Sequence, residues 1–204
     1  KGIWVAKKRY MMNVFDEEGI RFDTPKLKIM GVEAVKSSTP EVCRGKIKDA
    51  IRVIMNEDEN ALIKFVSDFK DVFKKLSPEE VAFPRSCNNL NKYSDSSSIY
   101  KKGTPIHVKG GLIYNHYIHR NKLERKYPLI KDGDKIKFLM LKQPNTIKDT
   151  VISFSTRIPE EFDLHKYVDY DTQFEKTFTD PLRFILDSIG WRLEREASLE
   201  SFFE

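Results

Sequence analysis

The hydrophobic and polar positions of the first 32 residues follow the period of a β-sheet. Residues 3–15 are rich in β-branched and aromatic side chains, and residues 20–22 resume this pattern after a polar turn at residues 16–19. Two extended runs joined by a short turn that contains glycine predict an antiparallel β-hairpin. Residues 26–32 alternate again after Asp23-Thr24-Pro25, which predicts a third strand.

From residue 39 onward the apolar spacing is mostly helical. Thr39-Pro40-Glu41 predicts a helix start, because it combines a hydroxyl N-cap, a proline in the first turn and an acid near the positive end of the helix dipole. Ser77-Pro78 predicts a second, shorter start of the same kind. Between them one helical face carries an apolar stripe: Leu62, Phe65, Val66, Phe69, Phe73 and Leu76.

The second half of the chain predicts helices around a small β element. Residues 106–119 have helical spacing despite two adjacent glycines, and residues 174–189 predict a C-terminal helix that a proline interrupts. Strands are predicted at residues 136–141 and 151–155, while residues 84–105 have a loop-like composition. The predicted fold class is therefore α+β: a short N-terminal antiparallel hairpin region, then a mainly helical lobe with a small inserted β element.

The composition places the chain among globular proteins. Its 204 residues are 40% hydrophobic, which is enough for a core, and no apolar run approaches the length of a membrane span, so no membrane partner is expected. Cys43 and Cys87 lie far apart with no metal-ligand spacing, which indicates a reducing compartment rather than a disulfide framework or a zinc site. Because the chain begins with Lys1 in strand-like sequence, we expect it to be a piece of a longer protein.

Positive charge is concentrated in the middle of the chain. Residues 101–148 carry twelve Lys and Arg against three acidic residues, whereas residues 157–204 carry six against twelve. A basic middle beside an acidic end is typical of a surface that meets a polyanion. The alternative is a solvated lysine-rich face.

The sequence offers few signatures of catalysis. It contains no GxxxxGK, GxGxxG, HExxH or GxSxG motif. His116 and His119 have helical spacing but no third ligand nearby in sequence, so surface histidines are the simpler interpretation. Asp169 and Asp171 flank Tyr170 at an expected helix start, where acids favour the helix dipole, and we prefer this interpretation to a metal site.

Basic residues interleaved with aromatic ones are the stronger signal. Lys7-Lys8-Arg9-Tyr10 is predicted to lie on a strand, with Lys8 and Tyr10 on one face and Lys7 and Arg9 on the other. Lys26 and Lys28 repeat the one-face arrangement on the next strand. Side chains about 7 Å apart on one face could bind nucleic-acid phosphates, although an ordinary exposed strand would have the same pattern.

A series of short motifs along the chain resembles one protein family. They are Lys7 to Tyr10, Pro25 to Gly31, Ser37 to Pro40, Asn88 to Tyr93, Thr104 to Val108, Val168 to Tyr170 and Ala197 to Phe203. Their order resembles the end of the palm and the thumb of family B DNA polymerases, above all those of T-even-like bacteriophages. The resemblance implies a palm-edge β segment at residues 1–36, a thumb domain at residues 37–196 and a clamp-binding tail at residues 197–204.

The same resemblance implies how the chain meets DNA. Lys8 would donate to minor-groove acceptors, Tyr10 would contact the primer strand and Lys28 would neutralise a primer phosphate. Such contacts check base-pair geometry without reading sequence, because all correct pairs share minor-groove acceptors. The full set of expected DNA-binding residues is Lys8, Arg9, Tyr10, Lys26, Lys28, Asn88, Lys92, Tyr93 and Lys109.

The resemblance also indicates what the chain lacks. The polymerase carboxylates of the family lie in DxxSLYP and DTD motifs, and neither occurs here. Since two aspartates must hold the metal pair for phosphoryl transfer, we expect no catalytic residue and no cofactor in this chain, with Mg²⁺ bound in the complete polymerase. The implied partners are primer–template duplex, a sliding clamp and the N-terminal exonuclease, palm and fingers portion, in the cytoplasm of an infected bacterial host.

The last residues predict a docking segment. At helical spacing Leu199, Phe202 and Phe203 would form one apolar face on a single turn. An apolar face at a chain end with little to cover it favours binding to the clamp, as the resemblance implies. The alternative is that the segment folds back on the preceding helix.

Three functions are therefore compared below. The first is a polymerase thumb that grips duplex without sequence preference. The second is an independent phage nucleic-acid-binding accessory protein, for which single-strand or site-specific binding is expected. The third is a small enzyme with a site around His107, His116 and His119.

Overall fold

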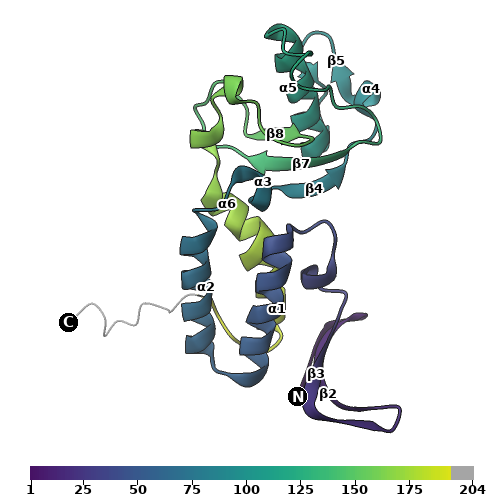
Figure 1. Cartoon of the computed structure of the whole chain (residues 1–204), viewed down its shortest axis with the longest axis vertical. Helices are drawn as coiled ribbons and strands as arrows, with labels where there is room; N and C mark the ends of the chain where they lie inside the picture. The colour runs from purple at the N-terminus through teal and green to yellow at the C-terminus, as the bar shows by residue number, and fades with distance from the viewer. Residues whose placement is uncertain (194–204) are drawn as a thin grey trace, which may run out of the picture. The chain divides into compact units, whose positions relative to one another are not determined.

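The computed structural model describes residues 1–193 and confirms the α+β class (Figure 1). An antiparallel sheet comes first along the chain, and helices follow it with two smaller sheets between them. The chain separates into two compact units. The predicted domain boundaries after residues 36 and 196 stay predictions.

The first unit is built from three segments of the chain, Lys1–Lys36, Cys43–Val72 and the segment that starts at Phe178. The second unit consists of Ser37–Val42 and the long continuous segment Phe73–Thr177. Each unit buries its own apolar side chains, and each is described separately below.

The sheet of the first unit has the strand order β1-β2-β3 and is antiparallel throughout. β1 spans Gly2–Ala6, β2 spans Arg9–Glu17 and β3 spans Ile20–Met30, so the predicted hairpin between residues 15 and 20 is confirmed. Two details were predicted wrongly. Residues 3–15 form two strands and not one, and β3 continues through Pro25, which an edge strand beside an irregular register tolerates.

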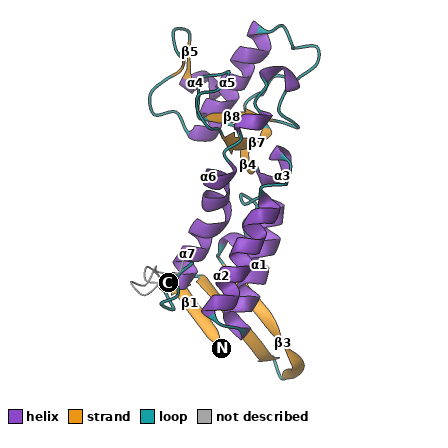
Figure 2. Cartoon of the chain, turned by 90° about the vertical axis from the view of Figure 1, so that its left-hand side faces the viewer, coloured by secondary structure: helices purple, strands orange, loops and turns teal. Residues whose placement is uncertain are grey.

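Three helices and a short turn complete the first unit. The turn η1 spans Glu33–Val35, α1 spans Glu41–Asn56 and α2 spans Glu59–Phe73, and the two long helices form a hairpin visible in Figure 1. α7 spans Asp180–Asp187 and packs beside β1 (Figure 2). The helices bury an apolar core made of Cys43, Ile47, Ile51, Ile54, Leu62, Phe69, Phe178, Leu182, Ile185 and Leu186.

The second unit centres on a sheet with the order β4-β7-β8, antiparallel throughout. β4 spans Phe83–Ser86, β7 spans Lys135–Met140 and β8 spans Val151–Phe154, so the two predicted strands are confirmed. The predicted helix α5 spans Ile106–Arg120 and packs on β8. A Cβ on Gly110 would lie 2.5 Å from the Ser153 hydroxyl oxygen, so the glycine that weakened the helical pattern permits this close approach.

Short elements connect these main ones. The segment 84–105, expected to be a loop, in fact holds β4, a helical turn and a two-stranded ribbon, all too short to give a periodic pattern. Asp169 caps the helix at residue 170 as predicted, because its carboxylate accepts from the Thr172 N–H at 3.1 Å. The remaining bounds are α3 Pro78–Val81, α4 Leu90–Tyr93, β5 Ser94–Asp95, β6 Ile99–Tyr100, η2 Glu160–Phe162, η3 His165–Tyr167, α6 Tyr170–Phe174 and the π-helix η4 Glu175–Thr179.

None of the helices in residues 1–193 is long and apolar enough to cross a membrane.

Candidate nucleic-acid interface

One face of the N-terminal sheet carries three of the residues expected to bind DNA. Lys28 lies opposite Met12 in the neighbouring strand, Lys26 lies opposite Val14, and Tyr10 is two positions from Met12 along β2. Directly paired residues of antiparallel strands point to the same face, as do residues two apart on one strand. Tyr10, Lys26 and Lys28 therefore share one face, which we call the outer face.

The opposite face of the sheet is the one that is buried. Ile3 and Met11 are 5% and 0% exposed. On the outer face, by contrast, Trp4 and Met30 are 63% and 45% exposed. Trp4 stacks on Tyr10 with 6.2 Å between ring centroids, which gives the outer face an aromatic patch beside its two lysines.

Glu17 partly neutralises the two lysines of the outer face. Its carboxylate lies 3.4 Å from Lys28 Nζ and 3.7 Å from Lys26 Nζ. Both lysine side chains are 47% exposed or more, and exposed ion pairs of this kind contribute little to stability. A phosphate could therefore replace Glu17 as the partner of either lysine.

Lys8 and Arg9 do not extend the outer face. The prediction that Lys8 lies on a strand with Tyr10 is wrong, since Lys7 and Lys8 form the turn between β1 and β2 and Lys8 has a φ of 63°. Gly31, with a φ of 69°, lies so close to the Lys8 carbonyl that no side chain would fit there. Lys8 thus projects from a turn whose backbone is fixed by Gly31.

Arg9 is engaged inside the first unit. Its Nη2 donates to both carboxylate oxygens of Glu33 at 2.7 and 3.0 Å, and its Nε donates to the Gly31 carbonyl at 3.2 Å. The guanidinium also lies 5.8 Å from the Phe184 ring centroid. These contacts make Arg9 a structural link between the sheet, η1 and α7.

Lys109 is similarly committed, within the second unit. Its Nζ lies 2.8 Å from the Asp149 carboxylate and 4.7 Å from the Tyr100 ring centroid, and the Tyr100 hydroxyl donates to the same carboxylate at 2.7 Å. Burial acts to lower the pKa of Lys109, but the hydrogen bonds to Asp149 and Tyr100 outweigh it and raise the pKa. Lys109 is therefore charged and paired in this structure.

Asn88, Lys92 and Tyr93 gather around the short helix α4 of the second unit. Asn88 and Lys92 are exposed, and Lys92 Nζ lies 5.3 Å from the Tyr93 ring centroid. The helix is anchored where the Leu90 N–H donates to Asp132 at 2.7 Å. This group presents a cation, an amide and an aromatic ring to solvent, which is the combination that phosphate-backbone contacts use.

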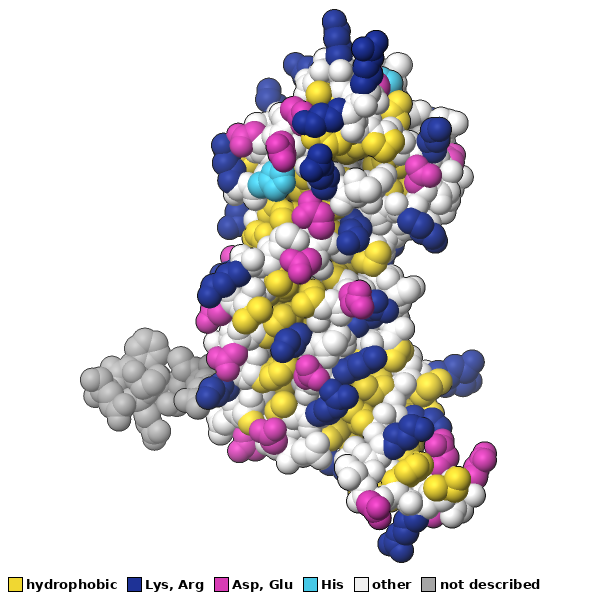
Figure 3. Space-filling view, in the orientation of Figure 1, with side chains coloured by type: hydrophobic (Ala, Val, Ile, Leu, Met, Phe, Trp, Pro, Cys, Tyr) yellow, Lys and Arg dark blue, Asp and Glu magenta, His cyan; other side chains and the backbone are white. Residues whose placement is uncertain are grey.

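The basic middle segment of the sequence belongs to the second unit. Residues 101–148 lie within Phe73–Thr177, and Lys and Arg side chains project from much of the surface of this unit that Figure 3 shows. The predicted residues therefore fall into two groups, and each group lies within its own unit. Trp4 was not expected on this face because the turn at Lys7-Lys8 was not recognised, so the alternation was not followed into β1. Met30 continues the alternation of Lys26 and Lys28 on β3, but an apolar side chain gave no signal of DNA binding.

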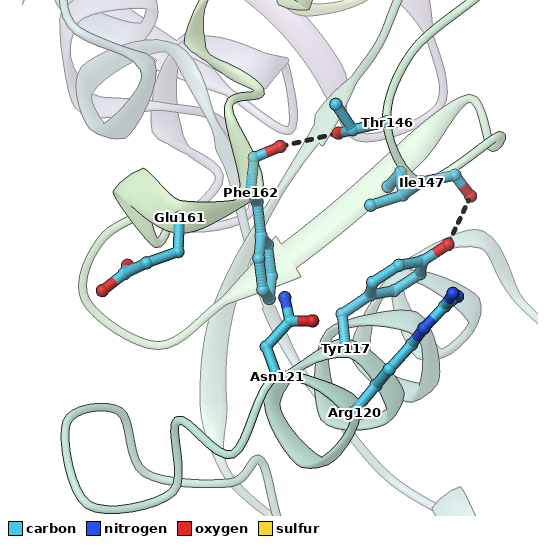
Figure 4. Close-up of a pocket in the computed structure, with 7 residues that line it drawn as sticks. All are labelled: Tyr117, Arg120, Asn121, Thr146, Ile147, Glu161 and Phe162. Carbon is cyan, nitrogen blue, oxygen red and sulfur yellow. Dashed lines mark hydrogen bonds between the residues drawn. The ribbon is translucent and has the colours of Figure 1, made fainter.

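One pocket of the second unit has none of the predicted DNA-binding residues in its lining. It has a volume of about 240 Å³ and lies beyond the end of α5, where the Tyr117 hydroxyl donates to the Ile147 carbonyl at 3.4 Å and Thr146 donates to the Phe162 carbonyl at 2.6 Å (Figure 4). These bonds tie the 142–150 loop to its neighbours. The full lining is Tyr117, Arg120, Asn121, Thr146, Ile147, Glu161 and Phe162.

Acidic and imidazole ligands do not converge in the described part of the chain. In residues 1–193 no three His, Cys, Asp or Glu side chains are grouped as a metal site. His119 Nδ1 lies 2.8 Å from Glu124, and both side chains are largely exposed. His116 and His119 are both exposed on α5, and the preference for surface histidines over metal ligands stays a prediction.

Comparison with known proteins gives the relationship of the chain. No family model matches it. It is 34% identical to the DNA-directed DNA polymerase of Enterobacteria phage T4 over 206 aligned positions, which cover 99% of this chain. It is 35% identical to the DNA-directed DNA polymerase of Escherichia phage RB69 over 207 aligned positions, which cover all of this chain. This chain is similar to one part of two phage DNA polymerases. It spans 22% of the length of each of these two relatives.

The relationship to phage polymerases confirms the resemblance expected from the short motifs. Because the alignments cover 99% and 100% of the chain, the outer face and the α4 group both lie within the part that matches.

Proposed function

We propose that this chain is the palm-edge and thumb part of a family B phage DNA polymerase, and that it grips the primer–template duplex. The relationship to two DNA-directed DNA polymerases over the whole chain supports the class. The observation that carries the grip is the outer face, where exposed Lys26 and Lys28 stand beside Tyr10 and the exposed Trp4. Backbone-directed cations position a duplex without reading its sequence, which a replicative polymerase requires.

The proposed contacts follow from the placement of each side chain. Lys26 and Lys28 are two residues apart on β3, so they project about 7 Å apart and meet successive phosphates of the primer. Tyr10 contacts the primer strand from the same face, and Lys8 donates from its turn to minor-groove acceptors, which all correct base pairs share. Asn88, Lys92 and Tyr93 contact the duplex backbone from the second unit.

The chemistry of synthesis belongs to the rest of the polymerase. The exonuclease, palm and fingers portion supplies the carboxylates that hold Mg²⁺, and this chain alone incorporates no nucleotide. Mixed with that portion, the chain restores primer extension, which a gel assay with labelled primer measures. Extension by the isolated chain in excess magnesium would overturn this division of labour. The site of action is the cytoplasm of an infected bacterium.

The C-terminal tail supplies a second interaction. Leu199, Phe202 and Phe203 lie outside the described residues 1–193, and we propose from their spacing that they fill a hydrophobic pocket on the sliding clamp. Burying three such side chains contributes free energy at roughly 25 cal/mol per Å² of apolar area, less the cost of ordering the tail.

The duplex grip is tested by the salt dependence of binding. If four to six basic groups touch phosphates, the logarithm of the affinity falls against the logarithm of the salt concentration with a slope of about -4 to -5. Lys28→Ala and Lys8→Ala each flatten this slope by about one unit and weaken all sequences alike. Fluorescence anisotropy with a labelled primer–template measures it, on the reassembled polymerase if the chain alone binds too weakly.

A matched control is available on α1. Arg52 is exposed and already paired with Asp49 at 2.6 Å, so Arg52→Ala removes one positive charge away from the outer face and leaves the slope unchanged. An affinity that does not depend on salt, or a strong preference for one sequence, would contradict the proposal.

The second candidate is an independent nucleic-acid-binding accessory protein. The second unit favours it, because most of that unit is one continuous segment, Phe73–Thr177, which includes the basic stretch 101–148. This alternative predicts binding to single strands or to a specific site, and no restoration of primer extension by the chain.

A further inference from the structure

Arg85 is a half-buried cation that lies beside two stacked aromatic rings in the second unit. It lies on β4, and its guanidinium carbon is 5.6 Å from the Phe83 ring centroid and 5.9 Å from that of Phe138. The two rings stack on each other with 5.0 Å between centroids. Its Nη1 donates to the carbonyls of Ser38 at 2.7 Å and Pro84 at 2.9 Å. The side chain is thus fixed by rings and by backbone carbonyls.

What Arg85 lacks is a negative partner. No carboxylate of residues 1–193 lies within ion-pair distance of it, whereas Arg9, Arg52 and Arg183 each have one. Burial lowers the pKa of Arg85, which is the sign of a charge that has lost water without gaining an anion. An opposite charge stabilises a cation that has lost part of its hydration, so Arg85 is a candidate for binding an external anion.

A titratable imidazole borders one of the same aromatic rings. His107, in the first turn of α5, has its ring 6.2 Å from that of Phe138. Burial lowers the pKa of His107, and the charge on Arg85 lowers it further. Lys109, the next cation along α5, is paired with Asp149. Lys109 is positively charged, so it does not supply the missing anion to Arg85 or His107.

The fold explains why both groups reach one place. Phe83 pairs with Phe138, and Phe138 pairs with Ser153, so these three and Arg85 share a face of the sheet. α5 covers that face over β8, where the Ser153 hydroxyl donates to the His107 carbonyl at 2.8 Å. β4 is one edge strand of this sheet, and α5 packs mainly on β8 at the other edge.

We propose that Arg85 and His107 together bind one phosphate oxyanion, supplied by the backbone of bound DNA. The hydrogen bonds of Arg85 use Nη1, while Nε and Nη2 have no protein partner among the described residues and are not buried. Two parallel N–H donors of a guanidinium match two phosphate oxygens, and aromatic packing fixes their direction in advance. His107 donates a third hydrogen bond when it is protonated.

The shared chemistry is that of a phosphate dianion or diester, so a free phosphate ion would occupy the same site. Only the assignment of the phosphate to DNA rests on the proposed function. A bound phosphate would raise the pKa of His107, because an opposite charge favours the protonated ring. Arg85 is the charged group that faces His107 from β4, and it would then be neutralised by the same anion.

The test uses the full chain with two probes. In the first arm, the imidazole signals of His107 are followed by NMR against pH with and without inorganic phosphate, and phosphate is expected to raise the pKa of His107 in the wild type but not in Arg85→Gln. In the second arm, anisotropy with a labelled primer–template duplex compares the wild type with Arg85→Gln, Arg85→Lys and His107→Gln. Loss of one phosphate contact flattens the salt slope by about one unit and lowers affinity about 3- to 10-fold.

The controls separate binding from folding. Lys166→Gln removes a cation of the second unit that is already paired with Asp163 at 2.6 Å, and it is expected to change neither arm. If Arg85→Gln does not fold, the duplex-binding measurement is made with His107→Gln instead. This variant should fold, because the stacking of Phe83 on Phe138 does not involve the imidazole. Arg85→Lys keeps the charge but not the two parallel donors, and it is expected to bind as weakly as Arg85→Gln.

The outcomes are distinguishable. If phosphate shifts His107 but the chain binds no duplex, the anion site stands and the duplex grip fails. If the chain binds duplex and neither Arg85→Gln nor His107→Gln changes the salt dependence of the affinity, the duplex grip stands. Arg85 and His107 then have only a structural role. An unchanged pKa of His107 in phosphate, together with unchanged duplex affinity in both variants, overturns the inference.

Discussion

Replacing Gly110 with alanine tests how closely α5 approaches β8. An added Cβ would lie 2.5 Å from the Ser153 hydroxyl oxygen, 2.8 Å from the Ser153 backbone nitrogen and 3.0 Å from the Ile152 carbonyl carbon. Two of these atoms belong to the backbone of the buried strand β8, so they cannot move without displacing the strand. Alanine should gain about 1 kcal/mol from helix propensity, but overpacking of this kind costs about 1–3 kcal/mol.

The same substitution also disturbs a hydrogen bond. The Ser153 hydroxyl donates to the His107 carbonyl at 2.8 Å, and its displacement costs about 1 kcal/mol more. We therefore expect Gly110→Ala to lower the free energy of unfolding of the second unit by about 1–3 kcal/mol. Gly45 provides the matched control, because it lies in helix α1 with no atom within 4 Å of an added Cβ. Gly45→Ala should stabilise the first unit by about 0.5–1 kcal/mol.

Amide hydrogen exchange is the suitable assay, because it reports the two units separately where a single unfolding curve would not. A loss of about 1–3 kcal/mol speeds exchange about 5- to 150-fold in α5 and β8 of Gly110→Ala. If this variant exchanged as slowly as the wild type while Gly45→Ala gained protection as expected, α5 would not lie as close to β8 as the structure has it, and the reasoning would be refuted.

Two further predictions concern a carboxylate and the tail. The hydrogen bond from Lys126 is the main reason that the pKa of Glu161 falls from 4.5 to about 2. A depressed folded-state pKa gives stability that is present above the unfolded pKa and lost as pH falls, so Glu161→Gln should flatten the decline in urea midpoint between pH 4.5 and pH 2. A variant that declined as steeply as the wild type would show that other carboxylates cause the acid sensitivity. Deleting residues 198–204 should leave clamp-free primer extension unchanged and remove clamp-stimulated processivity. Surviving clamp stimulation with a lowered melting temperature would instead mean that the tail is part of the core.

The sequence predicted long elements well because their apolar periods are regular. The stripe from Leu62 to Phe69 and the strand at 136–141 each lie in an element of the expected type. Prediction from the sequence failed where the backbone conformation of a single residue or a very short element was decisive. Lys8 has a positive φ that residue type alone does not indicate, and β4 is too short for a period to appear.

The candidate interface shows the same limit. Alternation along β3 was sufficient to place Lys26 and Lys28 on one face. The commitment of Arg9 to Glu33 and of Lys109 to Asp149 was not predictable, because each pair joins residues 24 or more positions apart. Whether a cation is free or paired depends on such long-range contacts, so a count of basic residues overstates what a surface offers to DNA.

The division of the chain has a consequence for its synthesis on the ribosome. Phe73–Thr177 is continuous, so nearly all of the second unit has been made before the ribosome reaches residue 178. The first unit must wait for Phe178 and the apolar face of α7, which together carry four buried core side chains: Phe178, Leu182, Ile185 and Leu186. Until they emerge, the apolar faces of α1 and α2 lack their covering. The nascent chain therefore depends on the late arrival of α7, and slow translation through that stretch would lengthen the time during which a chaperone or a protease meets an open core.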